Sequence, residues 1–134
     1  MGLDVGDRRI GVALSDPLGI LATPLTIVDC HNEAADIEAI VSIITQNQVE
    51  QVIVGLPRSM NGSLGKQVEK VKAFVRSLRE RIEIPVEFRD ERLSSVSARR
   101  LIRDAKQKMG RHDDAVAAAL ILQTYLDERE RATN

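Results

Sequence analysis

The sequence predicts an α/β fold in which helices flank a mixed five-stranded sheet, with three antiparallel strands followed by two parallel ones. Residues 1–28 alternate apolar and polar side chains with the two-residue period of strands. After them, helical patterns alternate with short apolar runs, which is typical of parallel strands joined by helical crossovers. The 134 residues are enough for one domain, so we expect residues 1–134 to share one hydrophobic core.

The first three strands are separated by two predicted turns. Residues 6–9 and residues 16–19 both contain glycine, and each follows a short alternating segment. Such short connections favour antiparallel pairing of the strands that they join.

Two helical crossovers follow in the chain. Residues 33–46 carry apolar side chains at helical spacing, and residues 49–56 form a run rich in β-branched residues that Pro57 ends. Residues 63–80 form a strongly amphipathic pattern that leads to a short strand over residues 85–89. The two strands are therefore predicted to extend the sheet in parallel.

Two further helices complete the predicted fold. Ser94 or Ser95 can cap a helix whose inward residues lie between 98 and 105. Asp113 or Asp114 can cap a last helix that runs to about Arg129.

The composition excludes several classes of protein. With 43% hydrophobic and 29% charged residues, the chain has the composition of a soluble globular protein. Its longest apolar run, residues 115–122, is far shorter than the roughly 20 residues of a membrane span, so we expect no membrane partner and a cytoplasmic location. Cys30 is the only cysteine, and with two histidines it supplies too few soft ligands for a structural zinc site. Any metal would therefore be held by oxygen.

The distribution of charge indicates a surface for phosphate contacts. The net charge is −1, but residues 89–112 carry +5 and the other residues −6. A basic stripe of this kind suits a nucleic-acid backbone, although a solvated helix face would have the same composition. Residues 54–63 connect a strand to a helix, where amides and Asn61 could bind phosphate or simply form a turn and a cap. The candidate nucleic-acid contacts are Asn61, Arg92, Arg99, Arg100, Arg103, Lys106, Lys108 and Arg111.

Three carboxylates lie near predicted element ends where a ligand would bind. Asp4 lies between two glycines on one strand face, Glu91 follows the strand over 85–89, and Asp114 begins the last helix with its side chain inward. Carboxylates from separate elements suit Mg²⁺ or Mn²⁺, and two such ions could cleave a phosphodiester. Each acid also has a structural interpretation: Asp4 could bind turn amides, while Glu91, Asp113 and Asp114 could serve helix N-termini.

Four blocks of residues resemble the bacterial YqgF family, also called RuvX. They are Gly2–Gly6 with Arg9–Ala13, Val54–Pro57 with Asn61–Gly62, Asp90–Ser94, and Asp114–Ala118 with Ile121–Gln123. The blocks span nearly the whole chain in order and spacing. The resemblance implies a ribonuclease H-like fold and a nuclease whose acidic triad falls on Asp4, Glu91 and Asp114.

We therefore expect a metal-dependent endonuclease that processes the 5′ end of pre-16S rRNA, acting as a monomer or a homodimer on precursor rRNA. One alternative is a Holliday junction resolvase that acts on branched DNA in recombination and repair. A second alternative is a non-catalytic RNA-binding assembly factor, which would use the same basic stripe. Nucleotide-binding ATPases of related fold need a second such domain, which 134 residues cannot supply.

Overall fold

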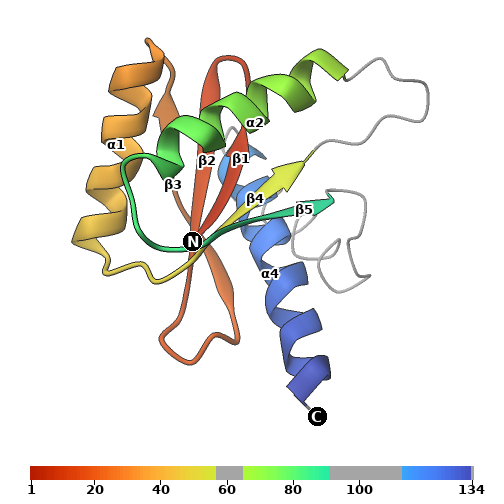
Figure 1. Cartoon of the computed structure of the whole chain (residues 1–134). Coiled ribbons are helices and arrows are strands. Elements are labelled where there is room, and N and C mark those ends of the chain that lie inside the picture. The colour runs from red at the N-terminus through yellow and green to blue at the C-terminus, as the bar shows by residue number, and fades with distance from the viewer. Residues whose placement is uncertain (57–64, 91–112, 134) are drawn as a thin grey trace.

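The computed structural model describes residues 1–56, 65–90 and 113–133, and these residues form a mixed five-stranded sheet flanked by helices (Figure 1). The strand order is β3-β2-β1-β4-β5, with antiparallel pairing from β1 to β3 and parallel pairing of β1 with β4 and of β4 with β5. The strands are β1 (Gly2–Val5), β2 (Arg9–Ser15), β3 (Ala22–Asp29), β4 (Val52–Leu56) and β5 (Val86–Asp90). The predicted fold class is confirmed.

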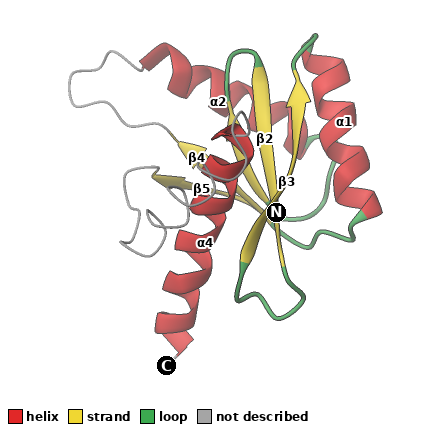
Figure 2. Ribbon diagram, turned by 180° about the vertical axis from the view of Figure 1, so that it is seen from behind, coloured by secondary structure: helices red, strands yellow, loops and turns green. Residues whose placement is uncertain are grey.

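The helices cover both faces of the sheet. Helices α1 (Glu33–Gln46) and α2 (Gly65–Arg79) lie on one face of the sheet, and α4 (Asp113–Thr133) crosses the other face. In the view from behind, α4 lies in front of the strands (Figure 2). The helix predicted around residues 94–105 lies outside the described residues. Among the helices of the described segments, none combines the length and the apolar character needed to cross a lipid bilayer.

Because side chains alternate along the strands, a separate cluster of buried residues lies on each face of the sheet. The face toward α1 and α2 carries large apolar residues, of which Leu3, Val12 and Val54 are fully buried. The face toward α4 carries small residues, such as Ala13, that pack against Ala118 of the helix. Burial of the large side chains supplies the driving force for folding, while the small ones let α4 approach the strands closely.

Two element boundaries differ from the prediction by three or more residues. The fourth strand begins at Val52 rather than at residue 49, because a C-terminal motif of α1 includes the intervening residues. Gln48 adopts a positive φ of 52°, and Val49 donates a backbone hydrogen bond to Ile44 at 3.0 Å, as in a Schellman motif. Helix α4 continues to Thr133 instead of ending near Arg129, since residues 129–133 contain neither glycine nor proline to stop it.

Candidate active site

Asp4 lies near the carboxyl end of β1, on the sheet face that α4 covers. Its neighbour Leu3 is completely buried in the core beneath α1 and α2, so alternation directs Gly2 and Asp4 toward the opposite face. Asp4 is half-buried. The prediction that Asp4 shares a face with glycines rather than with the large apolar residues is confirmed.

The glycines on this face let α4 lie directly on the strands. A Cβ atom on Gly2 would come within 2.6 Å of the Ala118 carbonyl oxygen and 2.8 Å of the Leu122 Cβ. A Cβ atom on Gly11 would overlap the backbone carbonyl of Asp114. Neither position can carry a side chain unless α4 moves, because a helix backbone cannot give way as a flexible side chain can.

The contact at Gly11 brings Asp114 to the level of Asp4. Gly11 is the cross-strand partner of Asp4 in the ladder between β1 and β2. Directly paired residues have Cα atoms roughly 4.5–5.5 Å apart and side chains on the same face. The first turn of α4 therefore lies over the strand pair at the position of Asp4, so that two of the three predicted acids share one side of the sheet.

Glu91 lies outside the described residues, but β5, the strand that precedes it, ends at the same edge of the sheet as β1. Residues of β4 and β5 pair up to Leu56 and Asp90, and β4 runs parallel to β1. The carboxyl ends of three parallel strands thus meet at one edge, which is where ligands of α/β sheets bind. Participation of Glu91 remains a prediction, as does any part played by the side chain of Asp113.

The predicted nucleic-acid contacts also lie outside the described residues, and their role remains a prediction. They are Asn61, Arg92, Arg99, Arg100, Arg103, Lys106, Lys108 and Arg111.

Arg89, the first residue of the predicted basic stripe, joins β5 to α4. Its guanidinium lies 2.9 Å from a carboxylate oxygen of Glu128, and its Cζ atom lies 5.2 Å from the ring centroid of Tyr125. The Arg89 side chain is 30% exposed, and its charge is largely balanced by this acid. A structural role in holding α4 therefore accounts for Arg89.

Arg9 is a residue near the candidate acids that sequence reasoning missed. Its Nε atom lies 3.6 Å from Oδ2 of Asp114. The available signal was its place in the turn directly after the Asp4 strand, whereas attention went to the denser positive charge of residues 89–112.

Two contacts from α2 also reach this end of the sheet. Gln67 donates from Nε2 to the carbonyl of Val5 at 3.0 Å, and Lys70 forms an ion pair with Asp7 at 2.7 Å. They attach the first half of α2 to the turn between β1 and β2.

The donor set at this edge suits a hard divalent cation. Asp4 and Asp114 supply carboxylate oxygens, which Mg²⁺ and Mn²⁺ prefer. The described part of the chain holds no cluster of three or more potential metal-ligating side chains. A third ligand from Glu91 is a prediction from the sequence.

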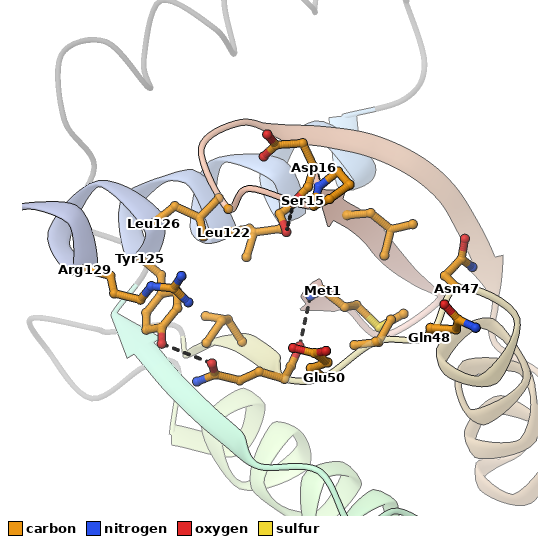
Figure 3. A pocket seen from close by; sticks show the side chains of 16 residues that line it. Met1, Ser15, Asp16, Asn47, Gln48, Glu50, Leu122, Tyr125, Leu126 and Arg129 are labelled. Atoms are coloured by element: carbon orange, nitrogen blue, oxygen red, sulfur yellow. Dashed lines mark hydrogen bonds between the residues drawn. The ribbon is translucent and has the colours of Figure 1, made fainter.

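A cavity of about 550 Å³ lies at the opposite end of β1 (Figure 3). Met1 lines it, together with Asp16, Glu50, Tyr125 and Arg129. Burial lowers the pKa of the Met1 amine to about 6, and this amine donates to the Gln51 carbonyl at 3.0 Å. The cavity lies at the amino end of β1 and Asp4 is not among its lining residues, so the cavity does not belong to the candidate active site.

The order and pairing of the five strands and the helices on both faces define the class of ribonuclease H-like folds. The structure is similar to that of Thermus thermophilus RuvC in complex with Holliday junction substrate, with a TM-score of 0.67 and 15% identity over 96% of this chain and 93% of that one. It is also similar to the fowlpox virus resolvase bound to Holliday junction DNA, with a TM-score of 0.56 and 11% identity over 96% of each chain. Both likenesses establish the fold.

The chain belongs to the RuvX family, whose profile, described as Holliday junction resolvase, matches residues 1–128. A relative from Moorella thermoacetica is 51% identical over 130 residues, covering 95% of this chain and 93% of its own, and carries the name "Putative pre-16S rRNA nuclease". A relative from Dehalococcoides mccartyi with the same name is 48% identical over 125 residues, covering 92% and 94%. Both descriptions are of nucleases, hydrolases of phosphodiester bonds, which is the class of enzyme that the sequence predicted.

Proposed function

We propose that this chain is an endonuclease that uses Mg²⁺ or Mn²⁺ to cleave structured nucleic acid, and that its substrate in the cytoplasm is the 5′ end of pre-16S rRNA. The observation that carries the proposal is the contact of α4 with Gly11, which places Asp114 beside the strand of Asp4. The names of the relatives support precursor rRNA as the substrate.

Asp4, Asp114 and Glu91 would hold the ions, which we propose to number two. When bound, the ions would supply an activated water and stabilise the leaving oxygen. The chain's own contribution is positional: a strand holds Asp4 and a helix resting on Gly11 holds Asp114, so neither depends on a loop for its placement. Without a counter-charge the clustered carboxylates repel one another, and this favours cation binding at the site.

Cleavage assays with two substrates test the proposal. The protein is incubated with a fragment of precursor 16S rRNA and, separately, with a four-way DNA junction, each with and without Mg²⁺ or Mn²⁺. We expect metal-dependent cutting of the RNA, and loss of cutting in Asp4→Asn and Asp114→Asn with the fold and binding retained. Asp7→Asn is the matched control, because Asp7 is exposed in the neighbouring turn and forms an ion pair with Lys70.

A resolvase is the second candidate function, favoured by the description of the family. Cutting of the junction alone would establish it in place of RNA processing, and a two-fold junction would then favour a homodimer over a monomer. Salt-sensitive binding of either substrate without turnover would contradict both nuclease functions and establish a non-catalytic assembly factor.

A further inference from the structure

Arg9 is held in place at the edge of the candidate active site by the turn that follows β1. The backbone N–H of Gly6 donates to the carbonyl of Arg9 at 2.9 Å, and a Cβ atom on Gly6 would lie only 2.9 Å from that same oxygen. Arg9 begins β2 two residues before Gly11, so the two share a sheet face. The side chain of Arg9 therefore leaves the sheet on the side where Asp4 and α4 lie.

The contact of Arg9 with Asp114 is too weak to be a structural requirement. The two atoms are 3.6 Å apart, and the side chains are 52% and 39% exposed. Ion pairs as exposed as this contribute little to stability. The guanidinium has five N–H donors, and those outside this single contact can be offered to a ligand.

A phosphodiester at this edge would meet strong repulsion from the carboxylates. Carboxylate side chains such as those of Asp4 and Asp114 repel the negative charge that each phosphate of a nucleic acid carries. A guanidinium binds phosphate through short, charge-assisted and often bidentate hydrogen bonds, which makes arginine suited to offset this repulsion. The exposure of Arg9 leaves it accessible to a backbone that approaches the acids.

We propose that Arg9 is a phosphate-binding residue of the substrate site: it pairs with Asp114 in the free protein and transfers to a backbone phosphate next to the acids when nucleic acid binds. The inference rests on the proposed function and adds a contact to it. The contact would be independent of base identity, since a phosphate carries no sequence information.

Binding measurements on Arg9→Gln test the proposal without relying on turnover. Fluorescently labelled precursor rRNA fragment and labelled four-way DNA junction are titrated in Ca²⁺ at several salt concentrations, and Mn²⁺ binding to the protein alone is measured by calorimetry. We expect affinity for the nucleic acid that the parent binds to fall by about tenfold, with the salt slope reduced by about one. Affinity for Mn²⁺ is expected to stay equal or rise, because a competing cation has left Asp114.

Arg81→Gln is the matched control. Arg81 forms an ion pair with Glu38 of α1 at 2.6 Å and is 47% exposed. The substitution therefore makes the same change of charge beside α1, a helix on the opposite face of the sheet from α4. Its nucleic-acid affinity should match that of the parent. Arg9→Lys, which keeps the charge but not the planar fork, should recover part of the lost affinity.

Three results would overturn the proposal, and they separate it from the proposed function. Parent-like nucleic-acid binding and salt slope in Arg9→Gln, with cleavage lost in Asp4→Asn, would refute the role of Arg9 and leave the nuclease in place. Loss of Mn²⁺ binding in Arg9→Gln would show that Arg9 organises the acids rather than the substrate. A parent protein that binds neither Mn²⁺ nor nucleic acid would refute both.

Discussion

Adding one methyl group at Gly11 should disturb the candidate site through the position of α4. In Gly11→Ala the new Cβ would lie 2.8 Å from the Ala115 nitrogen and would overlap the Asp114 carbonyl. Non-bonded carbon contacts are favourable at about 3.5–4.0 Å, so the first turn of α4 must retreat by about 1 Å or more. Overpacking of this kind costs about 1–3 kcal/mol in the free energy of unfolding.

Urea unfolding followed by circular dichroism measures this cost, since the chain has no tryptophan to report by fluorescence. The same samples are titrated with Mn²⁺, and we expect weaker binding because Asp114 moves away from Asp4. Gly65→Ala is the control, since a Cβ at Gly65 meets no atom of the described residues within 4 Å. Parent-like stability together with parent-like Mn²⁺ affinity in Gly11→Ala would refute the reasoning that this glycine sets the spacing of the acids.

Three other substitutions test contacts that shape the fold. Gln123→Leu should lower the free energy of unfolding, measured in urea, by about 1–3 kcal/mol. The buried Gln123 amide accepts a hydrogen bond from the Ala22 N–H at 2.8 Å, and the substitution would leave that N–H unpaired. An unchanged urea midpoint would contradict this. Gln48→Gly should raise the free energy of unfolding by about 1 kcal/mol, since glycine adopts the positive φ of this position without steric cost. A destabilised variant would argue against the Schellman motif. The N–H groups of Leu21 and Ile20 hold the pKa of the Asp16 carboxyl below its ordinary value of 3.8. Asp16→Ala should therefore lower the melting temperature at neutral pH. The difference from the parent should shrink as the pH falls below about 3.8, where the unfolded chain takes up this proton, and should vanish once the pH is below the lowered pKa of the folded protein.

Local pattern predicted the parts of the fold that depend on the alternation of side chains. Leu3 is buried on one face and Asp4 lies on the other, as the two-residue period requires. Gly11 likewise lies on the face kept small. The backbone of Asp114 contacts Gly11, so the first turn of the last helix rests on this small face.

Features that depend on turn geometry or on contacts between distant segments could not be predicted in this way. The start of β4 is set by the positive φ of Gln48, a residue with no particular preference for that conformation. The approach of Arg9 to Asp114 joins residues more than 100 positions apart, and charge counts along the chain give no sign of it. Arg89 belongs to the most basic stretch of the sequence but is used to hold α4, because Glu128 lies opposite it in the folded chain.

Calorimetric titration with Mn²⁺ in the absence of nucleic acid tests the central claim most directly, namely that Asp4 and Asp114 hold a common cation. The account predicts saturable binding to the parent and to Asp7→Asn, and its loss in Asp4→Asn and in Asp114→Asn while circular dichroism stays unchanged. Binding of Mn²⁺ to both of the last two variants with the parent's affinity would contradict it.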